Sequence, residues 1–178
     1  MLAVALALYP FLIYFSYEYF NVAAIVILCL FLVRAFATSI ANIKDNPLVD
    51  VGKYGAFIGI ALCVGYFIFE QQQLLLFYPV MVNVTLLFFF ARSLIHKPAI
   101  ITLFAERFSE EFPEEHIPYT EKVTLAWCVF FGLNAVASLV TVLFFDIQIW
   151  TLYNGFISYL LIALMFAIEF VTRKLVLR

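Results

Sequence analysis

One short segment of the chain holds the side chains best suited to metal binding or proton transfer. They are Glu110, Glu111, Glu114, Glu115 and His116. Carboxylates and imidazole can ligate zinc or iron, and they can also act as general acid and base. Pro113 and Pro118 interrupt residues 109–118, however, and no helical Glu/His ligand set repeats there. Because charge runs are usually solvated surface, we interpret the segment as a wet acidic loop without metal or cofactor, and keep a metal or catalytic site as the weaker alternative.

The same segment offers a docking surface for a protein partner. It lies within residues 96–122, which hold nine of the 22 charged residues between long runs of Leu, Ile, Val and Phe. The candidate docking residues are Lys97, Glu106, Arg107, Glu110, Glu111, Glu114, Glu115 and His116. The sequence contains no Ser/His/Asp set, phosphate-binding loop, HExxH motif or pair of intramembrane carboxylates. We therefore expect a protein that is not an enzyme.

A second group of polar residues lies inside the apolar runs. The candidates are Asn83, Trp127, Asn134, Ser138, Thr141, Asn154 and Ser158. The spacing is i, i+4, i+7 from Asn134 to Thr141 and i, i+4 from Asn154 to Ser158, which places each set on one stripe of a helix. Such stripes either hydrogen-bond between membrane helices, at about 0.6 kcal/mol each on average, or line a polar pocket for a lipid. We expect Asn134 to find its partner in Asn154 or Asn83.

The elements that position these residues must be membrane helices. The chain is 66% hydrophobic and 12% charged, whereas an ordinary soluble domain is about 45–50% apolar and about 25% charged. A soluble fold of 178 residues could not cover so much apolar surface, so lipid must be the solvent for most of the chain. The net charge of −2 gives no reason to expect a nucleic acid partner. Cys29, Cys63 and Cys128 are isolated, which indicates packing rather than a disulfide or zinc framework.

Six membrane spans are expected in one integral membrane domain, residues 1–178. They cover residues 2–17, 20–40, 54–69, 74–95, 123–145 and 151–171, since a spanning helix needs about 20 mostly apolar residues. Residues 99–108 should form a short helix in the membrane interface, with Thr102, Glu106 and Arg107 on its polar side. The expected fold is therefore an all-α polytopic bundle of about six transmembrane helices plus a short cytoplasmic interfacial helix.

The basic residues predict the orientation of this bundle. One side receives all ten: Arg34, Lys44, Lys53, Arg92, Lys97, Arg107, Lys122, Arg173, Lys174 and Arg178. The other side receives Glu18, Glu70 and Asp146 and no basic residue. Because positive charge stays on the cytoplasmic side of a membrane, both termini and residues 96–122 should be cytoplasmic.

Charged residues inside the spans are expected at the membrane surface. Arg34 and Arg92 lie near the cytoplasmic ends of their spans, where their side chains can extend to the headgroups. Glu169 lies four residues before Arg173 near the end of the last span, which predicts an i, i+4 ion pair.

Two further patterns concern packing. Trp127 and Trp150 fall near opposite ends of the fifth span, as residues of an aromatic belt do. Gly55 and Gly59 form a Gly-x-x-x-Gly motif, which allows a close helix crossing either within the chain or in a homodimer.

Several short motifs share the layout of one known family. Leu125-Ala-Trp-Cys-Val-Phe-Phe131 is similar to a Leu-Ala-Trp-x-x-Phe-Phe signature, and His96-Lys97-Pro98 to a Lys-Pro at the head of a cytoplasmic loop. Tyr9-Pro10 with the aromatic run to Tyr19 resembles the start of that family, and Trp150-x-x-Tyr153-x-x-Phe156 resembles its Trp-x-x-Phe-Lys-x-Phe segment. The family is the bacterial intracellular septation protein A family. Asn154 in place of the lysine, and a longer acidic loop, indicate a divergent relative or a sister family.

The resemblance implies a small multi-pass inner-membrane protein of Gram-negative bacteria, linked to cell division, elongation and envelope synthesis and without established enzymatic activity. We therefore expect a scaffold or accessory factor whose partners are membrane lipids and other inner-membrane proteins, with a homodimer through Gly55 and Gly59 as an option. The alternative is lipid or lipid-intermediate handling, or a small transporter, accessory to an envelope lipid biosynthetic pathway.

Overall fold

The computed structural model describes residues 8–15, 19–40, 47–108 and 112–176, and these are almost entirely helical. In chain order the elements are α2 (Tyr9–Phe15), α3 (Phe20–Ile40), α4 (Pro47–Phe69), α5 (Gln73–Leu76), α6 (Tyr78–Ile95), α7 (Ile100–Phe108), η2 (Glu114–His116), α8 (Ile117–Phe144), α9 (Ile147–Leu152), η3 (Tyr153–Ile157) and α10 (Ser158–Val176). The short η2 is a 3₁₀ helix and η3 is a π-helix. No strand occurs in the described ranges, which confirms the all-α class.

Within the described residues, five segments are long and apolar enough to cross a membrane. They are Phe20–Ser39, Asp50–Phe69, Gln73–Ile95, Glu114–Phe144 and Ile147–Val176. These correspond to five of the six expected spans. The first expected span is described only as the seven-residue α2, and the rest of it lies outside the described residues.

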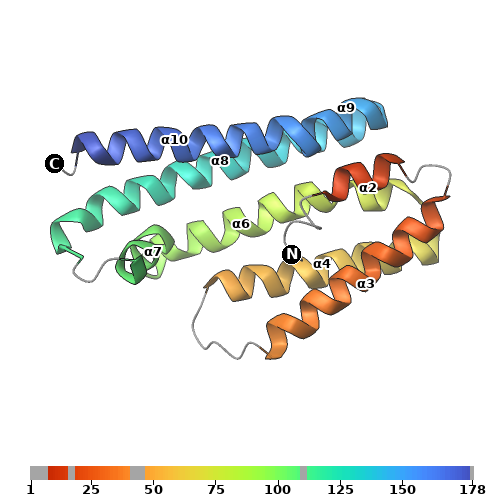
Figure 1. The fold of residues 1–178 in the computed structure, drawn as a ribbon, viewed down its shortest axis with the longest axis horizontal. Helices are drawn as coiled ribbons and strands as arrows, with labels where there is room; N and C mark the ends of the chain where they lie inside the picture. The colour runs from red at the N-terminus through yellow and green to blue at the C-terminus, as the bar shows by residue number, and fades with distance from the viewer. Residues whose placement is uncertain (1–7, 16–18, 41–46, 109–111, 177–178) are drawn as a thin grey trace.

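Helix α6 is the centre of the bundle (Figure 1). It packs along α8 on one side and along α4 on the other, and α3 packs against α4. Helix α10 runs back along α8 (Figure 1), and the short α2 contacts α3 and α9. The end of α3, the start of α4, α7 and the end of α10 lie at one end of the bundle (Figure 1). The Lys and Arg of the described residues lie near the ends of α3, α6 and α10, near the starts of α4 and α8, on α7 and in the α6–α7 connection, whereas Glu70 directly follows α4 and Asp146 directly precedes α9.

The tryptophans do not form the expected aromatic belt, so that expectation is wrong. Trp150 is fully buried, and its indole N–H donates to the carbonyl of Leu76 at 3.1 Å. Trp127 is also buried, and its ring packs on the rings of Phe131 and Phe166. A tryptophan at the end of a span contacts lipid only if it lies on the lipid-facing side of its helix. The packing of neighbouring helices determines which side faces the lipid.

The expected outer face of α7 is also partly wrong. The sequence pattern places Thr102 on the polar side with Glu106 and Arg107, but Thr102 is only 1% exposed because α7 packs against α8. Its hydroxyl lies 2.7 Å from the hydroxyl of Thr120 on α8. A threonine can lie on a buried face when a facing residue satisfies its hydroxyl, so polarity alone did not identify the outer face. Glu106 and Arg107 are exposed, as expected.

The two glycines of the Gly-x-x-x-Gly motif have different surroundings. Gly59 is buried where α4 crosses α3, and a Cβ at this position would overlap the ring of Phe31. Gly55 has open space around its Cα, with no neighbouring atom within 4 Å of an added Cβ. Of the two glycines of the motif, only Gly59 therefore serves a close approach within the described residues.

Candidate functional site

The amide-bearing candidates form a buried hydrogen-bonded cluster that joins α6, α8, η3 and α10. The side-chain N–H₂ of Asn134 donates to Asn83 Oδ1 at 3.0 Å and to Ser158 Oγ at 2.9 Å. The hydroxyl of Tyr153 donates to Asn134 Oδ1 at 2.8 Å. Asn83 is thus one of the two partners expected for Asn134, while the spacing of the polar residues did not indicate Tyr153.

Asn154 bonds to the neighbouring turn of α8 instead of to Asn134. Ser138 donates to Asn154 Oδ1 at 2.6 Å, and Asn154 Nδ2 donates to Thr141 Oγ1 at 3.1 Å and to the carbonyl of Trp150 at 2.9 Å. Asn154 lies in the π-helix η3, whose wider turn shifts the register of the following residues. Regular helical spacing in the sequence could not reveal this shift.

The cluster has the chemistry of a structural contact rather than of a catalytic site. The amide groups of Asn83, Asn134 and Asn154 all have protein partners, and only Thr151 Oγ1 is a buried side-chain polar atom without one among the described residues. Satisfied polar networks of this kind fix the register of packed helices. Trp127, the remaining candidate, lies outside the cluster and belongs to the cavity described next.

A cavity of about 1030 Å³ lies at the basic end of the bundle, between α6, α7, α8 and α10. We name it the aromatic cavity, because its walls include Phe90, Phe104, Phe112, Tyr119, Trp127, Phe131 and Phe166. Its charged lining residues are Arg173, Lys174 and Glu169, and His116 also contributes. Aliphatic and aromatic walls beneath a charged rim suit an amphiphilic molecule. No motif in the sequence indicates this cavity, because four separate helices form it.

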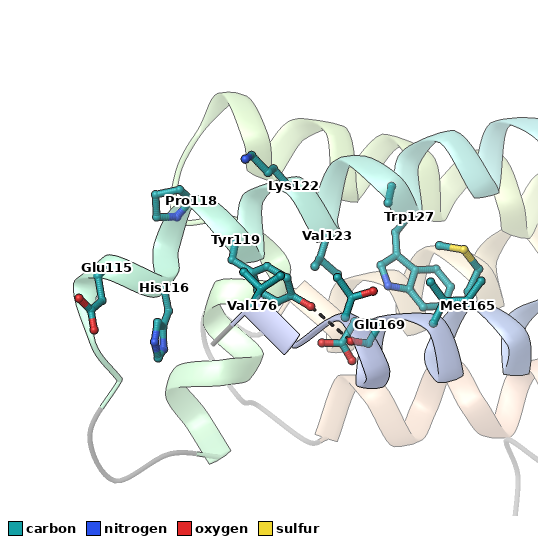
Figure 2. A pocket seen from close by; sticks show the side chains of 13 residues that line it. Glu115, His116, Pro118, Tyr119, Lys122, Val123, Trp127, Met165, Glu169 and Val176 are labelled. Atoms are coloured by element: carbon teal, nitrogen blue, oxygen red, sulfur yellow. Dashed lines mark hydrogen bonds between the residues drawn. The ribbon is translucent and has the colours of Figure 1, made fainter. Parts of the chain in front are cut away.

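A groove of about 900 Å³ lies on the other flank of α10, against α8, and Figure 2 shows it from close by. The hydroxyl of Tyr119 donates to the carbonyl of Glu169 at 3.3 Å and so links α8 to α10, and the indole of Trp127 lies next to Met165 (Figure 2). Tyr119, Trp127 and Glu169 line both the groove and the aromatic cavity. The groove is lined by one cation, Lys122, and by two carboxylates, those of Glu115 and Glu169. The formal charge of its lining is therefore negative.

The described candidate docking residues lie in the α6–α7 connection, on α7 and in η2. Lys97 forms an ion pair with Glu121. Glu106, Arg107, Glu114 and Glu115 are exposed, and His116 is half-buried with its ring near that of Phe112. Glu110 and Glu111 lie outside the described residues. Within the part of the chain that the structure describes, no three or more His, Cys, Asp or Glu side chains lie together as a metal-binding group.

Replacing Glu114, Glu115 and His116 together by alanine is expected to leave both metal content and fold unchanged. Two of the side chains are exposed and none belongs to a group of metal ligands among the described residues. Elemental analysis of the purified protein checks this prediction. Stoichiometric zinc or iron in the unmodified protein that disappears in the triple variant would contradict it.

Arg34 differs from the sequence expectation, while Glu169 agrees with it. Arg34 is half-buried, and its Nε–H donates to the carbonyl of Gly52 on α4 at 3.3 Å, so its side chain turns onto the protein rather than out to the headgroups. Arg92 is exposed at the end of α6, as expected. The Glu169 carboxylate lies 3.6 Å from Arg173 Nε, which confirms the i, i+4 ion pair.

Comparisons of the chain with protein-family models, with curated proteins and with solved structures found no match. The resemblance to the septation protein A family therefore remains a prediction. The function is inferred below from the geometry of the cavities and the charges around them.

Proposed function

We propose that the protein binds a single anionic lipid or lipid intermediate at the basic end of its bundle, as a non-enzymatic accessory of envelope synthesis in the bacterial inner membrane. The observation that carries the proposal is the aromatic cavity of about 1030 Å³ with Arg173 and Lys174 at its rim. Its volume lies just above the range of about 300–1,000 Å³ that is typical of small-molecule sites.

The charged rim, rather than the apolar walls, should select the ligand. Lipid tails are as apolar as protein side chains, so apolar walls alone give little preference over the bilayer. The cavity is lined by two cations, Arg173 and Lys174, and one carboxylate, Glu169, so its excess positive charge favours an anionic headgroup. The groove on the other flank of α10 has an excess of negative charge instead. Glu169 pairs with Arg173, while Lys174 forms no ion pair within the described residues and lies 4.4 Å from the ring of Phe170. Lys174 is thus the cation most available to a headgroup.

The basic end of the bundle also supports the proposed location. The described Lys and Arg lie near the ends of α3, α6 and α10, on α7, in the α6–α7 connection and near the starts of α4 and α8. The positive-inside tendency supports a cytoplasmic location for this end, where the leaflet is rich in anionic lipid. The resemblance to the septation protein A family supports an inner-membrane location and a connection with envelope synthesis.

The proposal is tested by the lipid that copurifies with the protein. Arg173→Gln with Lys174→Gln should lose the bound anionic lipid, since each cation near an anionic surface contributes about 1 kcal/mol, or roughly a 30-fold weaker affinity for the pair. The matched control is Lys53→Gln with Arg92→Gln, which removes two exposed cations from the same end but away from the cavity. Ala105→Trp, which fills the cavity and keeps its charges, should also lose the lipid. Equal lipid retention in all variants by native mass spectrometry would exclude the site.

The expected orientation leads to a separate prediction. A cysteine introduced at Glu115, which is exposed at the basic end, should react with a membrane-impermeant maleimide only from the cytoplasmic side. A cysteine at Gln71, exposed in the turn at the opposite end, should react only from the outside. Labelling of intact cells and of inverted vesicles checks both sites, and external labelling at position 115 would overturn the orientation.

A scaffold function is the second candidate, because the basic end also displays acidic side chains that are open to a partner. Glu106, Glu114 and Glu115 are exposed and form no ion pair with another described residue, and the open space at Gly55 leaves room for a helix of a second copy or of another membrane protein. Crosslinking in native membranes, followed by identification of captured proteins, tests this candidate. If the double variant Glu106→Ala with Glu114→Ala no longer crosslinks to the captured partner but keeps its bound lipid, the result would favour the scaffold function over the lipid site.

A further inference from the structure

A second cavity, of about 270 Å³, lies between α2, α3, α6, α8, η3 and α10, and Arg34 is the charged residue in its lining. Arg34 is six residues before the end of α3 at Ile40, so it lies about 9 Å inside the end of the helix at a rise of about 1.5 Å per residue. Its Nε–H bonds to the carbonyl of Gly52, where a Cβ would lie 3.2 Å from Arg34 Nη2. The glycine therefore leaves room for the guanidinium to lie against α4.

Arg34 has hydrogen-bonding capacity that the described residues do not use. A guanidinium has five N–H donors, and the described residues provide one acceptor, a backbone carbonyl. Within the same residues, Arg34 has no carboxylate partner. Ionisable groups within membrane spans are costly, normally pair with another group, and mark ligand or ion pathways.

The other polar groups in the wall of the cavity are neutral. The amide cluster supplies Asn83, Asn134, Asn154 and Ser158. The amides are occupied by their protein partners, whereas the Ser158 hydroxyl accepts from Asn134 and donates to no other described residue. Unused N–H donors of a cation, and a hydroxyl proton without an acceptor, complement an oxyanion. The volume lies slightly below the range of about 300–1,000 Å³ typical of drug-sized ligands, which fits one carboxylate or phosphate group.

We infer that this cavity is an oxyanion-binding site, in which Arg34 binds the carboxylate or phosphate group of either a small free anion or a lipid headgroup. The inference stands apart from the proposed lipid site, since the two cavities share only Leu86, Phe131 and Ile162 in their linings. The role of Arg34 as a ligand-binding residue also explains why its side chain turns inward although the end of its helix is near.

A thermal-unfolding experiment tests the site. It measures the unfolding midpoint of the delipidated full-length protein in neutral detergent, and compares phosphate or acetate with chloride at equal ionic strength. Phosphate, acetate or both should raise the unfolding midpoint of the unmodified protein, and the rise should level off as the anion concentration increases. Arg34→Met should abolish the rise, and Arg34→Lys should weaken it. Arg92→Met, which removes an exposed cation from the same end, should preserve it. Val82→Phe fills the cavity while keeping Arg34, so it should also abolish the rise and provides a test if Arg34→Met does not fold.

Native mass spectrometry of the protein as first purified distinguishes the two sources of the oxyanion. A lipid headgroup predicts a bound anionic lipid that Arg34→Met lacks but that Arg173→Gln with Lys174→Gln retains. A free anion predicts the same lipid content in Arg34→Met as in the unmodified protein, together with the anion-dependent rise after delipidation. The inference would be overturned if the protein showed no anion-specific rise and no Arg34-dependent lipid. It would also be overturned if the rise in Arg34→Met were undiminished.

Discussion

Gly59→Ala is expected to destabilise the protein by about 1–2 kcal/mol, within the range of about 1–3 kcal/mol for overpacking a well-packed core, while Gly55→Ala leaves it unchanged or slightly more stable. At Gly59 the added methyl group would overlap the ring of Phe31. That ring cannot withdraw easily, because it is only 1% exposed and packs on Tyr9 and Tyr78 with centroids 6.4 and 4.8 Å away.

Helix propensity acts in the opposite direction at both glycines. Alanine is favoured over glycine by about 1 kcal/mol in a helix interior, so steric overlap must exceed this gain at Gly59 for the net effect to be destabilising. At Gly55 no neighbouring atom lies within 4 Å of the added Cβ, so only the gain applies. The two substitutions are chemically identical and four residues apart on one helix, which makes Gly55→Ala a close control.

Equilibrium unfolding in mixed detergent, with one denaturing component, measures both changes. Phe31→Leu introduced together with Gly59→Ala should recover part of the lost stability, because the smaller side chain makes room for the methyl group. Similar stability of the Gly55 and Gly59 variants would show that the α3–α4 crossing is looser than the structure indicates.

The positions of the helices could be predicted from the sequence because a membrane limits the choices. Backbone groups in lipid must be satisfied within the helix, so long apolar runs indicate spans, and five of the expected spans are present. The i, i+4, i+7 stripe from Asn134 to Thr141 was also informative. Buried polar groups need partners, and Asn83 supplies one to Asn134 from the facing helix α6.

Features that depend on several helices at once could not be predicted in this way. The π-helix at Tyr153–Ile157 changes which side of the last span faces α8, and hydrophobicity does not encode it. Arg34 has the sequence position of a surface cation, but at its distance from the helix end the side chain can extend outward to the headgroups or turn inward onto the protein. The inward position depends on the space that Gly52 leaves for the guanidinium. The aromatic cavity takes its walls from four helices, none of which is unusual in composition.

Asn134→Leu should lower the free energy of unfolding by roughly 2 kcal/mol, as three hydrogen bonds at about 0.6 kcal/mol each would give if additive. The lost bonds join Asn134 to Asn83, Ser158 and Tyr153, and so link α8 to α6, η3 and α10. Leucine is close to asparagine in size, so the effect should come from lost hydrogen bonds rather than from a cavity. Because the amide is satisfied by protein groups, the variant should keep the lipid of the aromatic cavity.

Thr85→Val is the control for this change, because it also removes a polar group from the middle of a span. Thr85 is half-buried on α6, and its hydroxyl donates to the carbonyl of Met81 in the same helix at 2.7 Å. Valine has nearly the same shape, and no hydrogen bond between helices is lost, so stability should stay nearly unchanged.

A double-mutant cycle of Asn134→Leu with Asn83→Leu isolates the bond between α8 and α6, since the coupling between contacting residues measures their interaction. A clear coupling energy is expected, because the Asn134 amide donates directly to Asn83 Oδ1. Coupling near zero with stability intact in Asn134→Leu, together with loss of bound lipid, would instead indicate that the Asn134 amide serves to bind a ligand and adds little to the packing of α8 on α6.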